Sequence, residues 1–323
     1  MSFIISQSFY FIIPLLIVAL AGLFSEKSGT VNIALEGIMV IGAFFGVLFL
    51  HYMQSVLKVQ MNPQLLLLLS LIVAGIAGLI FSSLLGFLAI KMRADQTIGG
   101  TALNLLAAAL VVYLSKAIVH DTRIYFSPVF EFKSNFLHQV PFVNYVFFNH
   151  AYLTTYIGIL ILIITVLVFK YTKFGLRLSA CGEHPQAAQS AGINVIKYRW
   201  AGVLISGFLG GLGGLAYVIP TSISFEGTVS GYGFLALAVL IFGQWKPSRV
   251  LLAAIFFGFF KTLSVVYFGI DVISGWMSSY PNIPFAMFFR ILPYVVTLIV
   301  LAITSKKSRA PKASGIPFDP LAG

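Results

Sequence analysis

Long apolar runs separated by short polar connections make up most of this chain. Because a membrane-spanning helix needs about 20 mostly apolar residues, we place nine spans, the first and seventh short, at positions 9–24, 31–50, 65–90, 96–119, 152–169, 200–219, 233–245, 250–268 and 285–304. The runs are continuous and do not alternate over about ten residues, which argues against transmembrane strands. The pattern predicts an all-α, polytopic transmembrane helical bundle of about nine spans.

Composition supports this class of protein. Of 323 residues, 59% are hydrophobic and 9% are charged, against roughly 45–50% and 25% in soluble domains. Too few polar residues remain to cover a large soluble core. Positions 1–23 lack a basic start and a small-residue cleavage site, so we expect this segment to be retained as the first span.

Basic residues set the expected orientation. Fourteen of the 20 Lys and Arg residues fall on alternate connections or in the tail: Lys27, Lys91, Arg93, Lys170, Lys173, Arg177, Lys197, Arg199, Lys246, Arg249, Lys306, Lys307, Arg309 and Lys312. Because cytoplasmic loops are enriched in Lys and Arg, we place these connections and the C-terminus in the cytoplasm and the N-terminus outside. The net charge of +11 therefore needs no nucleic-acid polymer as partner. We expect a transmembrane domain over 1–305, with a cytoplasmic loop at 170–199, and a cytoplasmic tail over 306–323 that is extended or disordered.

The sequence lacks catalytic and metal-binding patterns. Its five histidines are scattered over predicted loops without ligand spacing, and Cys181 lacks the surroundings of a reactive thiol. No G-x-x-x-x-G-K-[ST] phosphate-binding loop is present, so we do not expect this chain to hydrolyse ATP by itself. We predict no enzyme activity, and no metal or cofactor in this chain.

Ionisable side chains inside apolar runs are candidates for function, since each costs about 2.5–3.5 kcal/mol at the membrane centre. The set is Glu26, Lys27, Glu36, Glu226, Lys261 and Arg290. Lys261 lies in the middle of its span and should have a partner. Glu26 and Lys27 could instead form an ion pair at the membrane surface, and Arg290 could be an interfacial anchor.

Uncharged polar residues extend this candidate site. Asn32 and Glu36 are four positions apart, so on one helix they would share a face. Thr97, Thr101 and Asn104 form a stripe at helical spacing that should turn inward in lipid; the alternative is helix–helix hydrogen bonding. Gly207, Gly210, Gly211, Gly213 and Gly214 indicate close helix packing. We predict a substrate path lined or braced by Asn32, Glu36, Gln96, Asn104 and Glu226.

A Gly-Thr-Val sequence occurs twice, at 29–31 and at 227–229, each time before an apolar run. By the orientation above, the first run leads outward and the second inward. Inverted repeats with interrupted helices are typical of transporters. The alternative is a chance match in a biased composition.

The connection at 170–199 predicts a short helix between Pro185 and Gly192, since Pro favours helix starts and Gly favours helix ends. Its face of Ala187, Ala188 and Ala191 is small enough to dock into a groove of a cytosolic partner. The alternative, a helix lying in the membrane surface, would want larger apolar residues on one face.

Four blocks, in order, resemble one known family: FSEKSGTVNIALEGIMVIGAF, FGLRLSACGEHPQAAQSAGI, GYGFLALAVLIFGQWKP and SRAPKASGIPFDP. They are similar to the permease subunits of bacterial ABC importers of the ribose and branched-chain amino acid superfamily, within it most like the nucleoside and simple-sugar branch that works with basic-membrane-protein type lipoproteins.

The resemblance implies a heteromeric importer in the bacterial inner membrane. This chain and a related second permease would form the pore, cytosolic ATPase subunits would hydrolyse ATP, and an extracytoplasmic binding lipoprotein would deliver a nucleoside. By that likeness, the loop that contacts the ATPase contains Gly182, Glu183, Pro185, Ala187, Ala188 and Gly192. Three alternatives stay open: a simple-sugar permease, an ion-coupled secondary transporter that uses Glu26, Glu36 and Lys261, and a structural scaffold.

Overall fold

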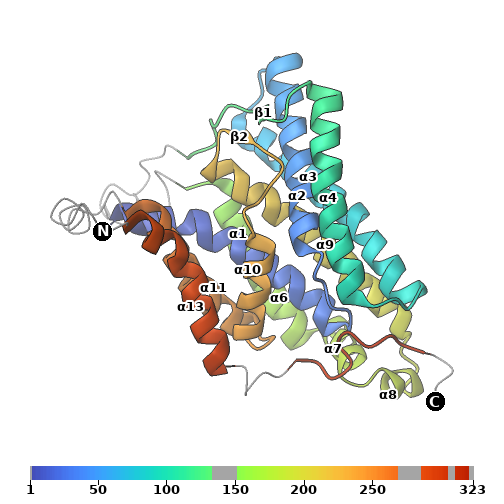
Figure 1. The fold of residues 1–323 in the computed structure, drawn as a ribbon. Coiled ribbons are helices and arrows are strands. Elements are labelled where there is room, and N and C mark those ends of the chain that lie inside the picture. The colour runs from blue at the N-terminus through green and yellow to red at the C-terminus, as the bar shows by residue number, and fades with distance from the viewer. Residues whose placement is uncertain (1, 133–150, 268–284, 305–309, 320–323) are drawn as a thin grey trace.

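The computed structural model describes residues 2–132, 151–267, 285–304 and 310–319. These residues form helices with one two-stranded sheet (Figure 1). In chain order the elements are α1 (Ser2–Lys27), α2 (Leu35–His51), η1 (Tyr52–Val56), α3 (Pro63–Gly86), η2 (Phe87–Lys91), α4 (Gln96–Val119), β1 (Ile124–Tyr125), α6 (Leu153–Tyr171), α7 (Lys173–Glu183), α8 (Pro185–Ser190), α9 (Val195–Thr221), β2 (Ser224–Phe225), α10 (Tyr232–Phe242), α11 (Pro247–Val266) and α13 (Phe285–Thr304). The all-α prediction is confirmed.

Every predicted span contains a helix, and the predictions at 96–119 and 285–304 have the bounds of α4 and α13. Within the described ranges, seven helices are long and apolar enough to cross a membrane: α1, α2 with η1, α3 with η2, α4, α6, α9 and α11. The prediction of a span at 233–245 is wrong, because α10 has 11 residues and reaches only about 16 Å at 1.5 Å per residue. This is the architecture of a multi-pass membrane protein.

Close packing of glycines holds the centre of the bundle. In α2, α3 and α9, methyl groups on Gly42, Gly78 or Gly211 would overlap the backbone of a neighbouring helix. The glycine-rich segment of α9 therefore brings backbones together, as its sequence predicts. Helix α1 runs through the middle of the bundle and is buried against α9, α10 and α11.

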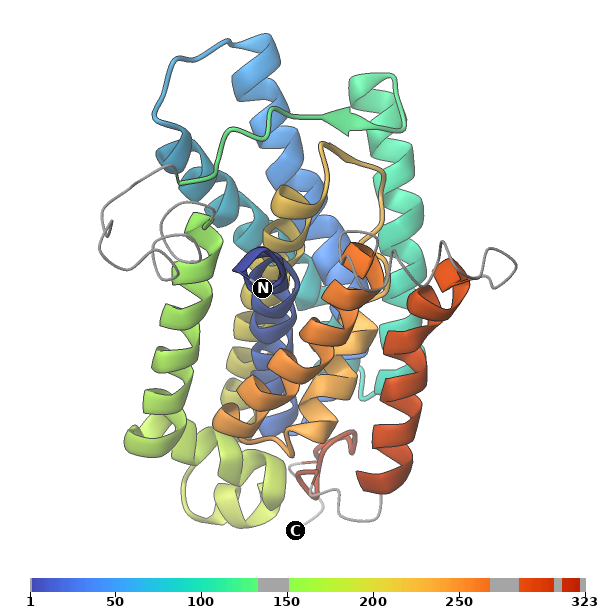
Figure 2. The same cartoon turned by 90° about the vertical axis from the view of Figure 1, so that its left-hand side faces the viewer.

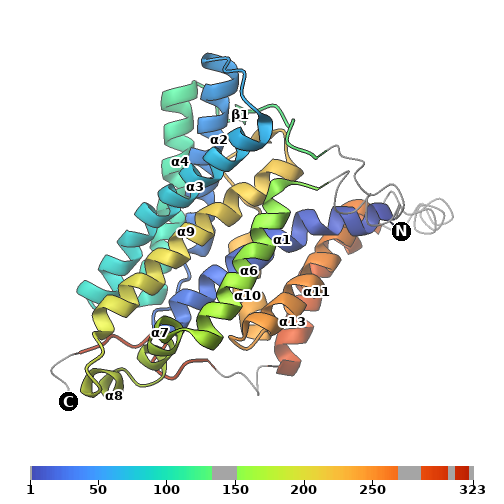
Figure 3. The same cartoon turned by 180° about the vertical axis from the view of Figure 1, so that it is seen from behind.

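The two ends of the bundle differ (Figure 2). At one, called here the β1/β2 end, the two strands pair antiparallel, and the ring of His51 at the end of α2 contacts the Tyr125 carbonyl oxygen at 2.9 Å. At the other, the α7/α8 end, the short helices pack under α1 and α9 (Figure 3). Helix α2 runs from the middle toward the β1/β2 end, whereas α10 runs toward the α7/α8 end.

The described part of the tail excludes one of the two predicted forms, extended or disordered. Residues 310–319, called here the strap, have no helix or strand but pack against the α7/α8 end, where Pro311, Ala313 and Phe318 are buried. Disorder is therefore wrong for this part of the tail. The predicted basic positions Lys306, Lys307 and Arg309 lie outside the described residues.

Candidate functional site

A non-helical break at positions 28–34 separates α1 from α2. Serine side chains close it, since the Ser25 hydroxyl donates to the Thr30 carbonyl at 2.7 Å and the Ser28 hydroxyl donates to the Ser25 carbonyl at 2.6 Å. Gly29 has φ +95°, a conformation open to glycine at little cost. The break frees backbone groups that need new partners within an apolar protein interior.

Two side chains of α4 satisfy those groups. The Gln96 side-chain oxygen accepts from the Val31 backbone N–H at 2.7 Å. Asn104 accepts from the Gly37 N–H at 2.7 Å and donates to the Ile33 carbonyl at 2.9 Å. Gln96 and Asn104 are two helical turns apart, so both reach the break from one side of α4.

The rest of the predicted stripe does not face the break. Thr97 and Thr101 are exposed on the outside of α4, and the Thr101 hydroxyl donates to the Thr97 carbonyl of its own helix at 3.0 Å. That bond satisfies the hydroxyl locally. The prediction of an inward stripe is therefore wrong for both threonines.

Asn32 and Glu36 do not share a helix face, because α2 begins only at Leu35. Asn32 lies within the break, is fully buried, and donates from its side chain to the Ser206 hydroxyl of α9 at 2.8 Å. Glu36 lies in the first turn of α2, and its side chain points toward the start of α10. Its carboxylate accepts from the backbone N–H groups of Gly231 at 2.9 Å and Gly233 at 2.7 Å.

Those two N–H groups belong to the start of α10, after a second break with Gly227 at φ +77° and Gly231 at φ +77°. The Gly-Thr-Val sequences thus each open a break that leads into a helix, and the helices run in opposite directions. Their first turns meet through Glu36, where a carboxylate is favourable beside a helix N-terminus. This is the arrangement that interrupted, inverted repeats predict.

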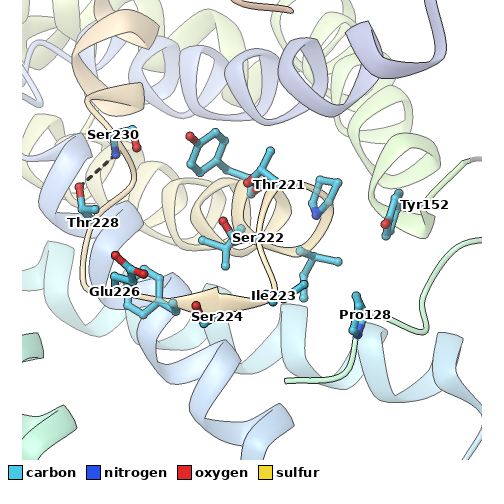
Figure 4. A pocket seen from close by; sticks show the side chains of 14 residues that line it. Pro128, Tyr152, Thr221, Ser222, Ile223, Ser224, Glu226, Thr228 and Ser230 are labelled. Atoms are coloured by element: carbon cyan, nitrogen blue, oxygen red, sulfur yellow. Dashed lines mark hydrogen bonds between the residues drawn. The ribbon is translucent and has the colours of Figure 1, made fainter. Parts of the chain in front are cut away.

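A pocket of about 570 Å³ opens at the β1/β2 end, beside the second break (Figure 4). Hydroxyl groups dominate its polar lining, and the full set of lining residues is Pro128, Tyr152, Tyr217, Val218, Ile219, Pro220, Thr221, Ser222, Ile223, Ser224, Phe225, Glu226, Thr228 and Ser230. Tyr217 also packs on Tyr232 of α10, with ring centroids 4.1 Å apart. Through that contact, the pocket adjoins the α10 terminus that Glu36 caps.

Glu226 lies at this pocket, apart from the other four predicted path residues. Its carboxylate is 3.1 Å from the Arg123 guanidinium, and both side chains are about half exposed. Glu226 therefore lies on the surface of the bundle. The prediction that it is an ionisable side chain inside an apolar run is wrong.

The other ionisable candidates have different surroundings. Glu26 is buried, and its carboxylate accepts from the Trp245 indole N–H at 2.6 Å. The Lys261 ammonium lies 5.9 Å from the centre of the Tyr232 ring, so its neighbour is an aromatic face. Arg290 lies in α13, and its side chain falls outside the described residues.

At the α7/α8 end, the predicted coupling residues divide into two groups. Gly182, Pro185 and Ala188 are buried, and a methyl group on Gly182 would overlap the Lys27 carbonyl of α1. Glu183 is half-buried, whereas Ala187 and Gly192 are exposed. Hollows of about 340 and 350 Å³ both include Gly192 in their lining. Cys181 is fully buried, and burial raises the pKa of its thiol to about 11.

Two buried residues near the first break, Ser206 and Arg199, are not part of the predicted site. Ser206 sits among the small residues of α9, where its hydroxyl is the only sign that it could bind the break. Arg199 is fully buried, although its sequence position beside Lys197 looks like a loop charge. The pocket hydroxyls carry no sequence signal, since Ser and Thr are common in connections.

Comparison with known proteins places the chain beside transport proteins. The family described as branched-chain amino acid transport system / permease component matches residues 4–301. The chain is 39% identical to the guanosine ABC transporter permease protein NupQ of Bacillus subtilis, covering 98% of this chain and 97% of that one. It is 38% identical to the nucleoside ABC transporter permease protein NupC of Lactococcus lactis, covering 98% and 96%. A second Bacillus subtilis protein, the guanosine ABC transporter permease protein NupP, is 26% identical over 77% of this chain and 70% of its own. No solved structure matches.

Proposed function

Since this chain belongs to the family of permease components of branched-chain amino acid transport systems, we propose that it is the membrane-spanning subunit of an ATP-driven importer of nucleosides. It is a transport protein and not an enzyme. The proposal that the substrate is a nucleoside rests on the full-length likeness to permeases named for guanosine and for nucleosides.

The importer needs partners. The two Bacillus subtilis relatives, at 39% and 26% identity, bear the same guanosine-permease description, which supports a pair of unlike permeases. We propose a second, related permease beside this chain, a cytosolic ATPase subunit that hydrolyses the ATP, and an extracytoplasmic lipoprotein that delivers the substrate. This chain has no phosphate-binding loop, so in this proposal the ATP is hydrolysed by the partner.

We place the α7/α8 end in the cytoplasm of a bacterial cell, with the protein in the cytoplasmic membrane and its C-terminus on the inner side. The support is charge, since Arg93, Lys173, Arg177 and Lys197 all lie at this end. Basic residues favour the cytoplasmic side. The β1/β2 end, with its hydroxyl-lined pocket, then faces outward.

The outward pocket is the proposed point of arrival of the substrate. A nucleoside is uncharged and carries ribose hydroxyls and base edges, which hydroxyl side chains can hydrogen-bond without holding them tightly. The four inner residues Asn32, Glu36, Gln96 and Asn104 have backbone or side-chain partners within 2.9 Å. Their role in this proposal is to brace the two breaks beside the path.

The ATPase contact is proposed at α8. Ala187 and Gly192 are exposed there and can touch a partner, while Gly182, Pro185 and Ala188 fix the helix to its own chain. Glu183 lies between the two groups. Movement of the ATPase would thereby reach α7, α9 and the end of α1, against which α7 packs.

Uptake measurements test the function. Cells with and without this gene are compared for uptake of labelled nucleosides and, separately, of labelled ribose and galactose. We expect nucleoside uptake to depend on the gene and sugar uptake not to. Equal nucleoside uptake in the two strains contradicts the substrate, and dependence of sugar uptake alone supports a sugar permease instead.

A further inference from the structure

The strap joins parts of the molecule that are distant in sequence. Its Ala313 N–H donates to the Gly182 carbonyl of α7 at 2.8 Å, and its Gly315 N–H donates to the Gly29 carbonyl of the first break at 3.3 Å. Gly315 has φ +81°, so the turn between these two bonds favours glycine. Within three residues, the strap contacts both the α7/α8 end and the break.

Arg199 of α9 secures the middle of the strap. Its side chain is 1% exposed, and its guanidinium donates to the Ile316 carbonyl at 2.9 Å and lies 5.7 Å from the centre of the Phe318 ring. On another side it adjoins Gly29, where an added methyl group would come within 2.9 Å of it. Within the described residues, the Arg199 Nε and Nη2 atoms have no hydrogen-bond partner and lie beside Gly29 of the break. A buried cation is costly unless it is paired, so the bond to the Ile316 carbonyl ties this charge to the strap next to the break.

The last part of the strap reaches the helices that hold the break and the ATPase contact. Phe318 packs in a small apolar cluster with Cys181 of α7, Ala188 of α8 and Val195 of α9. The Asp319 carboxylate is 3.2 Å from the guanidinium of Arg93, which lies just before α4. Helix α4 carries Gln96 and Asn104, the side chains that bond the break.

We propose that the strap is a coupling element of the transporter: it carries movement of α8 to the break between α1 and α2. This rests on the proposed function, in which an ATPase moves α8. Phe318 receives the movement from Ala188, and the backbone bonds of Ala313 and Gly315 with the Arg199 anchor deliver it to Gly29. Arg199 and Phe318 are positioning residues, since they act through the break and do not touch substrate.

The test compares alanine substitutions of neighbouring strap residues in the assembled importer, reconstituted with its second permease, ATPase and binding lipoprotein. Phe318→Ala removes the buried ring. Ile316→Ala is the matched control, because the Ile316 side chain is 57% exposed and its carbonyl bond to Arg199 is kept. A third variant ends the chain after Arg309. Nucleoside-stimulated and basal ATP hydrolysis, nucleoside uptake and thermal unfolding are measured for each.

We expect Phe318→Ala to lower the stimulated hydrolysis and the uptake by roughly tenfold, a usual size for coupling between sites, with basal hydrolysis and assembly kept. Ile316→Ala should behave as wild type, and the shortened chain should lose stimulation at least as far as Phe318→Ala. Unchanged stimulation in Phe318→Ala overturns the proposal. So does an equal fall of basal and stimulated hydrolysis with a lowered unfolding temperature, since that is loss of fold alone. If the wild-type importer moves no nucleoside, the proposed function fails separately from the strap.

Discussion

Glu36 and Gly233 are 197 positions apart in the chain, yet the Gly233 N–H donates to the Glu36 carboxylate at 2.7 Å. With the bond from the Gly231 N–H at 2.9 Å, this one side chain of α2 caps the start of α10. A carboxylate at a helix N-terminus contributes about 0.3–1 kcal/mol at an exposed site and up to about 2 kcal/mol when partly buried. Glu36 therefore links the two breaks of the bundle.

Replacing Glu36 should weaken both the fold and transport. Glu36→Ala leaves two N–H groups without their acceptor, which costs about 1–3 kcal/mol; Glu36→Gln keeps one acceptor oxygen and should cost less. Chemical unfolding of the purified subunit and nucleoside uptake measure the two effects. Glu226→Gln is the control for unfolding, because its exposed ion pair contributes about 0–1 kcal/mol. Equal losses of unfolding free energy for Glu36→Ala and Glu226→Gln would contradict the capping role.

Asn104 should matter more than Thr101, one turn earlier on α4. Asn104→Leu removes the bonds to the Gly37 N–H and the Ile33 carbonyl, so we expect the free energy of unfolding to fall by about 1–3 kcal/mol and uptake to fall with it. Thr101→Val removes a hydroxyl that bonds only within its own helix and should change little. The reverse order of effects would show that the outer face of α4 is the functional one.

Bulk at Gly192 should block the ATPase contact. Gly192 is exposed with φ +78°, and nothing lies within 4 Å of an added methyl group, so Gly192→Trp costs only the backbone strain of about 1–2 kcal/mol. We expect lower nucleoside-stimulated ATP hydrolysis in the assembled complex with normal membrane insertion. Gly192→Ala is the control, since it has the same strain without the bulk. Similar nucleoside-stimulated ATP hydrolysis in Gly192→Trp and Gly192→Ala would contradict an ATPase contact at this turn.

Glu183 should contribute to the same contact, since it lies between the buried and exposed groups of the α7/α8 end. Glu183→Ala is expected to reduce stimulated hydrolysis while the subunit stays inserted, as judged by its amount in washed membranes. Normal nucleoside-stimulated ATP hydrolysis in Glu183→Ala would show that Glu183 is not part of the ATPase contact.

Cys181 should resist thiol reagents in the folded protein. With a thiol pKa of about 11, roughly one thiol in a thousand is ionised at pH 8, and the thiolate is the reactive form. Burial also blocks access. A maleimide should label Cys181 only after unfolding, whereas Ala187→Cys in a Cys181→Ala background should be labelled at once. Rapid labelling of folded wild type would show that α7 opens.

Apolar length predicts the long helices well and the short one badly. The run at 96–119 follows Asp95, whose carboxylate accepts from the N–H groups of Thr97 and Ile98, so the polar boundary and the helix start coincide. At 233–245 the apolar run continues past the helix, because Gly243 ends α10 and Trp245 turns to bond Glu26. The hydropathy of the run does not indicate where that turn ends the helix.

The candidate site, too, could be predicted only in part from the sequence. Asn32, Glu36, Gln96 and Asn104 converge on the breaks because polar groups in an apolar segment must find partners. Their partners are mostly backbone groups, such as the N–H of Val31 and Gly37, which only an interrupted helix sets free and no side-chain pattern reveals. Thr101 fails the prediction because it bonds its own helix. The Pro and Gly content of the strap indicates disorder, while its order comes from backbone bonds and from Arg199.

The glycine crossings of α2, α3 and α9 have a mechanical consequence. At Gly42, Gly78 and Gly211 the backbones of the three helices lie so close that an added methyl group would overlap a neighbour, so a tilt of one helix would press directly on the other two. Helix α9 has 27 residues and runs from the proposed ATPase side to the outward pocket. At 1.5 Å per residue it is about 40 Å long, so a tilt of about 5° about one end would move the other by roughly 3.5 Å. A small rotation of α9 at one membrane face would thereby displace its opposite end by about the width of an atom.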